Sequence, residues 1–133
     1  MADIAVSMCD PSAWTPGTTG GGERGASYRQ FVDNRGNNEG RIHTEEPFDL
    51  RGADSLALEI ESGFMVSMWF FDADQLSIGV SLGKWATGGT YAVPDGAVYA
   101  AVLYARQSGA IAPSDVADHP FYVTLSGGGW LND

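Results

Sequence analysis

"FMVSMWFFDADQLSIGVSLGKW", residues Phe64–Trp85, contains the two strongest strand patterns of this chain. Its first part, Phe64–Phe71, is apolar on both faces of an extended backbone. Such a strand is covered on both sides or uses one face to bind a ligand. The second part, Gln75–Leu82, alternates between large apolar residues, Leu76 and Val80 among them, and small or polar ones. This alternation predicts a strand with one buried face.

Asp72 and Asp74 stand between these two strands, and the carboxylate pair can be interpreted as a turn or as a cation site. Aspartate is favoured in hairpin turns, because its side chain bonds to nearby backbone and tolerates unusual backbone angles. A calcium loop needs further oxygen ligands at regular spacing and a closing glutamate, and none follows Asp74 before the next strand begins. We therefore expect a turn here, with no metal and no cofactor.

Strand patterns continue on both sides of this hairpin. In Ser55–Ser62, "SLALEIES", apolar and polar residues alternate, and Ala97–Arg106 is a nearly continuous apolar run. Ser27–Asp33, "SYRQFVD", is interpreted as an imperfect strand, and a short strand begins at Arg41. Seven or eight short strands at spacings of roughly ten residues, without a convincing helix, predict an all-β antiparallel β-sandwich. The spacing alone does not separate a sandwich from a jelly roll or a small barrel.

The first 26 residues have the composition of a linker. Thr15–Gly25, "TPGTTGGGERG", is rich in Gly and Thr, which is typical of turns and connections. We therefore expect an irregular N-terminal arm over residues 1–26, anchored by Trp14, and a β-sandwich domain over residues 27–133. A chain of 133 residues suits a single domain with a hydrophobic core.

The chain is strongly acidic, with 17 acidic and 7 basic residues and a formal net charge of -10 at pH 7. This charge argues against a nucleic-acid partner, which requires a basic surface. No apolar run reaches the length of about 18 residues that would insert into a membrane, and the N-terminus lacks a signal-peptide pattern. Cys9 is the only cysteine, so no disulfide forms within the chain. We expect either a chain that is made in the cytoplasm or a fragment of a larger protein.

Catalytic patterns are weak in this sequence. His43 and His119 are the only histidines, and neither has the closely spaced partners of a zinc site. No nucleophile elbow of the GxSxG type is present. Carboxylate pairs for glycoside hydrolysis can be drawn between many acidic residues, but any acidic sequence offers such pairs. We expect a protein that is not an enzyme, and a small glycan hydrolase is the last-ranked alternative.

The aromatic residues indicate a binding function more strongly than the patterns above indicate catalysis. Flat aromatic rings suit sugars, because a sugar ring has an apolar C–H face and a rim of hydroxyl groups. The alternative is that Trp and Tyr pack in the core with their polar ends satisfied. Trp85 is the best candidate for a binding role, because it follows Gly83 and Lys84 just after a strand, where a loop would expose it.

The order of several motifs resembles a β-sandwich module of phage and prophage tail proteins. Arg41–Thr44, "RIHT", stands where that family has an "RIRT"-like strand after a loop rich in Gly and Asn. Phe70–Asp72 and Gly83–Trp85 resemble its aromatic hairpin, and Ile111–Asp115, "IAPSD", resembles the end of its last strand. The likeness covers most of the chain but neither its first two dozen nor its last dozen residues.

The resemblance implies a jelly-roll-like sandwich similar to carbohydrate-binding modules. It also implies a place in a virion or on a cell-surface protein, with a role in adhesion to host glycans or in joining virion parts. His43 replaces the second arginine of the family motif, so a contact of that cation with an anionic glycan does not carry over.

The leading hypothesis is a non-enzymatic phage or prophage virion module that binds a glycan of the host cell surface. For Arg41, a cross-strand ion pair with a glutamate of Ser55–Ser62 is the alternative. The expected ligand-binding residues are Trp85 as the stacking platform and Arg41, His43, Asn37 and Asn38 as its polar partners.

The second hypothesis is a structural or decoration protein of a virion that contacts only neighbouring subunits. Two features favour it, the linker-like first 26 residues and the two-faced strand Phe64–Phe71, since both suit a subunit interface. Under this hypothesis the chain forms a homo-oligomer.

Overall fold

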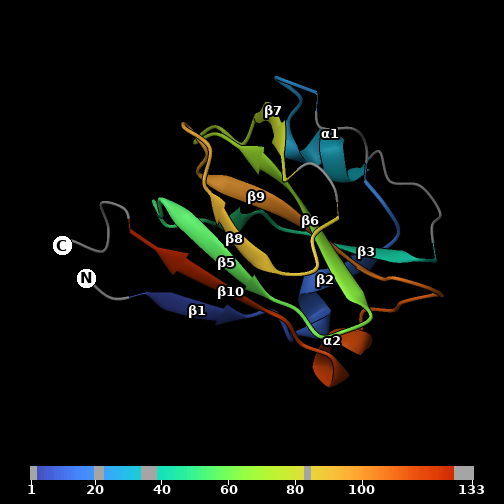
Figure 1. Cartoon of the computed structure of the whole chain (residues 1–133). Coiled ribbons are helices and arrows are strands. Elements are labelled where there is room, and N and C mark those ends of the chain that lie inside the picture. The colour runs from blue at the N-terminus through green and yellow to red at the C-terminus, as the bar shows by residue number, and fades with distance from the viewer. Residues whose placement is uncertain (1–2, 20–22, 34–38, 83–84, 128–133) are drawn as a thin grey trace.

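The computed structural model describes residues 3–19, 23–33, 39–82 and 85–127. Two antiparallel sheets pack face to face (Figure 1). The four-stranded sheet has the order β1 (Ile4–Ser7), β10 (Tyr122–Ser126), β5 (Ser55–Glu59), β8 (Gly89–Ala92). The six-stranded sheet has the order β2 (Trp14–Pro16), β3 (Arg41–Thr44), β9 (Tyr99–Arg106), β6 (Phe64–Phe71), β7 (Ser77–Ser81), and β4 (Phe48–Asp49) pairs with β9 beside β3.

The strand pairs are nested along the chain, and this nesting defines a jelly roll. β6 pairs with β7, β5 with β8, β3 with β9 and β1 with β10, each pair enclosing the previous one in the sequence. One long antiparallel hairpin folded over on itself produces this order. The expected all-β, jelly-roll-like sandwich is confirmed.

The core lies between the two sheets and is built by the alternation that the sequence shows. In β5, Leu56 and Leu58 are buried, with 0% and 4% of their surface exposed. From β6 the side chains of Phe64, Val66 and Met68 enter the same cluster. Each fully buried side chain of this size stabilises the fold by about 1.5–3 kcal/mol through removal of apolar surface from water.

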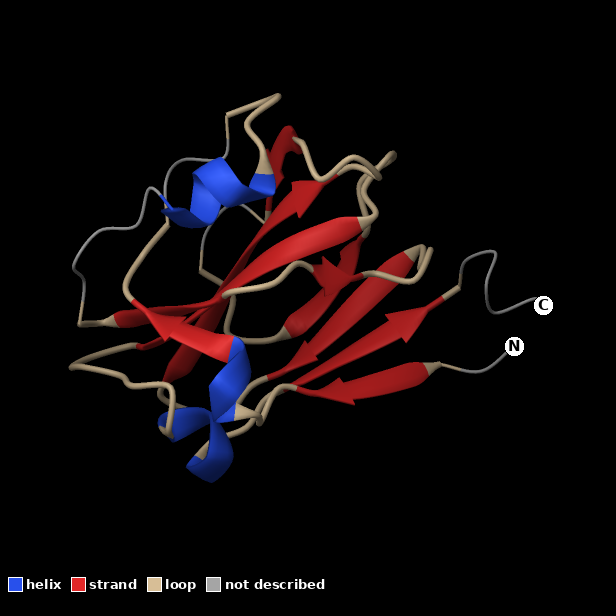
Figure 2. Cartoon of the chain, turned by 180° about the vertical axis from the view of Figure 1, so that it is seen from behind, coloured by secondary structure: helices blue, strands red, loops and turns tan. Residues whose placement is uncertain are grey.

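A helix covers the other face of the six-stranded sheet, and this corrects the expected strand in Ser27–Asp33. α1 (Tyr28–Asp33) is helical and lies across the sheet (Figure 2). Its buried residues, Tyr28, Phe31 and Val32, have the i, i+3, i+4 spacing of one helix face. They pack on Phe71 of β6. β6, which has apolar residues on both faces, is thus covered on both sides over part of its length.

The expected irregular arm is also corrected, because the described part of residues 1–26 belongs to the sandwich. β1 pairs with β10 in one sheet, and β2 pairs with β3 in the other. Between them lies a short 3-10 helix, η1 (Pro11–Ala13). Trp14 is buried against Tyr104 and Phe121, with ring centroids 6.1 and 5.9 Å away. The expectation that Trp14 anchors this segment is confirmed, although the segment is sheet rather than arm.

The Asp72–Asp74 stretch forms the turn between β6 and β7, as expected. One carboxylate oxygen of Asp72 accepts hydrogen bonds from the backbone N–H of Asp74 at 2.9 Å and of Leu76 at 3.0 Å. Gln75 has a positive φ of 61°, which fits a tight turn. The turn interpretation of the carboxylate pair is therefore confirmed.

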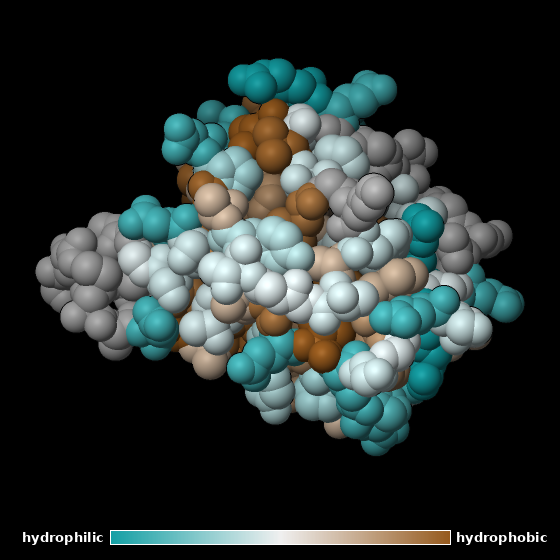
Figure 3. Space-filling model, viewed as in Figure 1, coloured by the Kyte–Doolittle hydropathy of each residue, from teal (hydrophilic) through white to brown (hydrophobic). Residues whose placement is uncertain are grey.

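β7 differs from the expected half-buried strand. Leu76 and Val80 are 37% and 40% exposed, whereas Ser77 is only 2% exposed. The reason is that β7 ends the six-stranded sheet and that the register of its pairing with β6 shifts between Trp69 and Phe71. Apolar side chains gather at the top of Figure 3, the end at which Figure 1 places β7.

The open edge of β7 is partly covered by the segment that leads into α1. The backbone N–H of Gly25 donates to Ser77 O at 2.8 Å, and the N–H of Ser77 donates to Ala26 O at 2.7 Å. Arg24 adds a hydrogen bond from its side chain to Ile78 O. Such coverage limits edge-to-edge association, which unpaired strand edges promote.

A second short helix, α2 (Asp115–Asp118), follows β9 and precedes β10. None of the helices in the described ranges is long and apolar enough to cross a membrane.

Candidate functional site

The candidate site lies on the face of the six-stranded sheet that points away from the core. On this face α1 covers Phe71 and Ala101. Arg41 of β3 lies on the part beyond α1, opposite Ala105 of β9, because its neighbour Ile42 points into the core. Trp85 lies there too, since the next residue, Ala86, pairs with Val66 and belongs to the core cluster. Arg41 and Trp85 therefore lie on the same side of the sheet.

Arg41 and Trp85 are in contact. The guanidinium carbon of Arg41 lies 5.1 Å from the centroid of the Trp85 ring, within the range of a cation–π interaction. Nη1 of Arg41 also donates a hydrogen bond to the Thr18 hydroxyl at 3.2 Å. Both side chains are partly exposed. The pair therefore forms a small surface in which an aromatic ring adjoins fixed N–H donors.

This contact decides between the alternatives for Arg41. The sequence left open an ion pair with a glutamate of Ser55–Ser62. Glu59 belongs to β5 in the opposite sheet, and Glu61, which lies after the end of β5, pairs with His119. Arg41 is instead held by Thr18 and Trp85. The sequence gives no indication of the role of Thr18, because it is one threonine of a Gly/Thr-rich stretch.

His43 does not fit the expected role of a polar ligand partner. It lies on β3 two residues after Arg41, yet its exposed fraction is 0%. Its Nδ1 lies 2.9 Å from the carbonyl oxygen of Gly17 and donates to it, because a carbonyl oxygen only accepts. Gly17 directly follows β2, the strand beside β3, and its N–H donates to Arg41 O at 2.8 Å. Its burial and its bond to Gly17 make His43 a packing residue. Asn37 and Asn38 lie outside the described residues.

A buried network holds β3 in place beneath Arg41. The Tyr28 hydroxyl donates to the main-chain oxygen of Thr44 at 3.0 Å and lies 3.3 Å from its hydroxyl. The Thr44 hydroxyl accepts the N–H of Val102 at 3.0 Å, which continues the β3–β9 contact past its last backbone pair. Burial raises the pKa of Tyr28 to about 12, and the bond with Thr44 opposes this rise.

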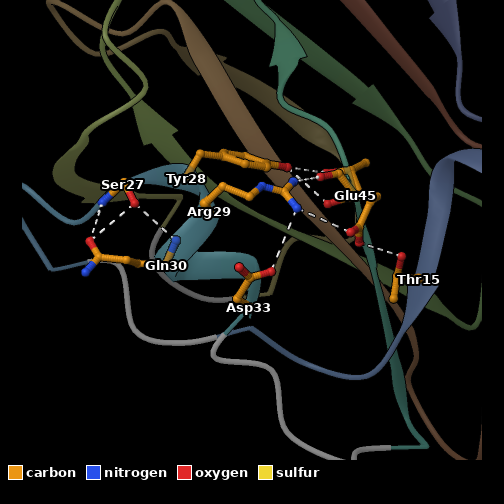
Figure 4. Close-up of polar contacts among 8 residues, drawn as sticks. Thr15, Ser27, Tyr28, Arg29, Gln30, Asp33 and Glu45 are labelled. Atoms are coloured by element: carbon orange, nitrogen blue, oxygen red, sulfur yellow. Dashed lines mark hydrogen bonds and ion pairs between the residues drawn. The ribbon is translucent and has the colours of Figure 1, made fainter.

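Arg29 of α1 ties the helix to the end of β3 (Figure 4). Its Nη2 donates to the main-chain oxygen of Glu45 at 2.8 Å, and its Nη1 lies 3.5 Å from the Glu45 carboxylate. The Thr15 hydroxyl donates to the same carboxylate at 2.7 Å. Nη1 of Arg29 also lies 3.8 Å from Oδ1 of the Asp33 carboxylate. These half-exposed pairs contribute little each, but together they fix α1 against β2 and β3.

A second group of aromatic residues serves packing rather than binding. Tyr104 stacks on Phe64 with ring centroids 5.2 Å apart and donates its hydroxyl to His119 O at 2.8 Å. Burial, with a smaller contribution from Glu61, raises the pKa of Tyr104 well above its ordinary value. Arg106 lies over Phe64 at 4.8 Å and pairs with Asp115 at 3.1 Å. The packing alternative for the aromatics is correct for this group.

Within the described ranges, no three His, Cys, Asp or Glu residues lie close enough together to hold a metal ion. His119 forms a pair with Glu61, its Nδ1 lying 3.0 Å from the carboxylate. Cys9 is exposed.

No family model matches the chain, and the searches of curated proteins and of solved structures found no match either. The likeness to phage tail modules stays an expectation drawn from sequence motifs, and the Arg41–Trp85 surface is the feature from which a function can be argued.

Proposed function

We propose that this chain is a non-enzymatic module of a phage or prophage virion that binds a glycan of the host cell surface. The contact between Arg41 and Trp85 on the outer face of the six-stranded sheet carries this proposal. An indole offers an apolar surface to the C–H face of a sugar. A guanidinium has five N–H donors in a fixed plane, and the one bonded to Thr18 orients the others.

The fold is compatible with this role. Jelly rolls occur in lectins and in viral capsid proteins, and one fold supports many functions. The net charge of -10 repels polyanions over the molecule as a whole. A neutral sugar that packs against the indole and accepts hydrogen bonds from Arg41 therefore suits the site better than a polyanionic glycan does.

A glycan array and a whole-cell pull-down test this proposal. We expect the wild-type chain to bind and Trp85→Ala to lose at least about ten-fold in affinity. The substitution removes both the ring that would stack on the sugar and the cation–π contact that orders Arg41. Tyr122→Ala is the matched control, because Tyr122 is a 40% exposed aromatic residue of the other sheet. Absence of binding at high protein concentration, or equal losses in the two variants, would overturn the proposal.

A second candidate function is a virion structural or decoration protein that acts through contacts between subunits. The observation in its favour is the exposure of the Leu76 and Val80 side chains at the β7 end of the six-stranded sheet, because exposed apolar side chains that lie close together suit a subunit contact. Light scattering after size exclusion tests it. A homo-oligomer that Val80→Lys dissociates supports this candidate, and a strict monomer at all concentrations counts against it.

A further inference from the structure

A pocket of about 430 Å³ opens between the edges of the two sheets, away from the Arg41–Trp85 surface. β1 forms one wall, η1 lies at one end, and the segment from the end of β3 to β4 forms the other wall. The volume is in the range of small-molecule sites, which is roughly 300–1,000 Å³. The lining residues are Val6, Met8, Ser12, Ala13, Thr44, Glu45, Glu46, Pro47 and Phe48.

The pocket combines apolar walls with two carboxylates and no basic lining residue. The walls come from the side chains of Val6, Met8 and Phe48. The Glu45 carboxylate already accepts the Thr15 hydroxyl at 2.7 Å. The Glu46 side chain is exposed, and no hydrogen bond or ion pair joins its carboxylate to another residue of the described ranges. Glu46 is therefore the acceptor that a ligand at this site would meet.

We propose that this pocket binds a small organic cation, a primary amine on a short aliphatic chain. An alkyl chain would lie along Val6, Met8 and Phe48, where it loses contact with water. Its ammonium group would donate to the carboxylate of Glu46 at the rim. The net charge of the whole chain, -10 at pH 7, attracts cationic ligands. It repels ligands that carry a carboxylate group, which would otherwise bind in an apolar pocket of this size.

The test is a methyl NMR titration of the chain labelled at its methionine methyl groups, with n-hexylamine, n-hexanol and hexanoate as probes. Met8 lines the pocket, whereas Met68 lies in the core and Met65 lies on β6, so these two are internal controls. We expect saturable shifts of Met8 alone, with affinity in the order amine, alcohol, carboxylate. The amine should exceed the alcohol by about two- to five-fold, the effect of one partly exposed charge pair.

Variants of Glu46 separate charge recognition from simple apolar binding. Glu46→Gln should make the amine and the alcohol equal, and Glu46→Lys should reverse the order so that hexanoate binds best. Ala13→Phe, at an exposed position of the lining, should weaken all three probes by filling the pocket. Because Glu46 is exposed, the thermal midpoints of its variants should match the wild type.

Three results would overturn the inference: an unmoved Met8 signal, equal binding of amine and alcohol to the wild type, or shifts of Met65 that accompany those of Met8. The inference does not depend on the glycan proposal, because the pocket and the Arg41–Trp85 surface share no residue.

Discussion

Thr44 offers the sharpest test of how β3 is held beneath the candidate site. β3 pairs with β9 through Arg41, Ile42 and His43, and its backbone pairing with β9 ends there. The next contact is made by a side chain, because the Thr44 hydroxyl accepts the N–H of Val102 at 3.0 Å. Thr44 is 5% exposed and Val102 is 0% exposed, so water does not replace a lost partner.

Thr44→Val removes this acceptor with little change in shape and leaves a buried N–H without a partner. We expect the free energy of unfolding to fall by about 1–3 kcal/mol, the cost of one buried unsatisfied donor. Thr44→Ser is the matched control, because it retains the hydroxyl and loses one methyl group. Its expected cost is about 0.8 kcal/mol, the contribution of one buried CH₂ unit.

Urea unfolding measures both costs, and amide hydrogen exchange locates them. In Thr44→Val the Val102 amide should exchange faster relative to the amides of Leu103 and Tyr104, whereas in Thr44→Ser the ratio should stay as in the wild type. If Thr44→Val unfolds at the wild-type urea concentration and Val102 keeps its protection, the assignment of this bond as a link in the sheet is wrong.

Three further predictions follow from the packing and from the turn. Trp14→Ala should lower the free energy of unfolding by about 3–5 kcal/mol, as expected for a large buried aromatic residue, and thermal unfolding giving a loss below about 1 kcal/mol would show that the N-terminal segment is not part of the core. Burial raises the pKa of Tyr28 from its ordinary value of 10.0 to about 12 in the folded chain. The fold favours the neutral phenol, so its stabilisation is present below pH 10 and is lost as pH rises to 12. The wild type should therefore lose about 2–3 kcal/mol more than Tyr28→Phe across that window in urea titrations, and parallel curves would contradict the burial of this hydroxyl. Asp72→Ala should cost about 0.5–2 kcal/mol by removing the acceptor of two turn hydrogen bonds, and calcium should leave the thermal midpoint of the wild type unchanged; a rise with calcium would support the cation-site alternative.

The strands of the hairpin could be predicted from the sequence because their pattern is local. Alternation in Ser55–Ser62 and the two apolar faces of β6 follow directly from the period of two in an extended chain. Asp72 could be assigned to a turn for a similar reason, since its side chain bonds backbone groups two and four residues away.

α1 and β1 could not be predicted in this way. In a segment of six residues, apolar positions 28, 31 and 32 fit an imperfect strand as well as one helix face. Only the burial of that face on Phe71 selects the helix. β1 has a composition that suits many structures, and it becomes a strand because β10, at the other end of the chain, offers it an unpaired edge.

The candidate site, too, could be predicted from the sequence only in part. The sequence by itself determined that Arg41 and Trp85 are residues of a kind that can bind a sugar, and that the fold is all-β and built of short strands. Only the tertiary structure decided that the two meet at 5.1 Å, that His43 is buried and bonded to Gly17, and that a pocket with Glu46 at its rim lies between the sheets. The physical reason is that periodicity acts between near neighbours, whereas contact and burial depend on which distant strands pair.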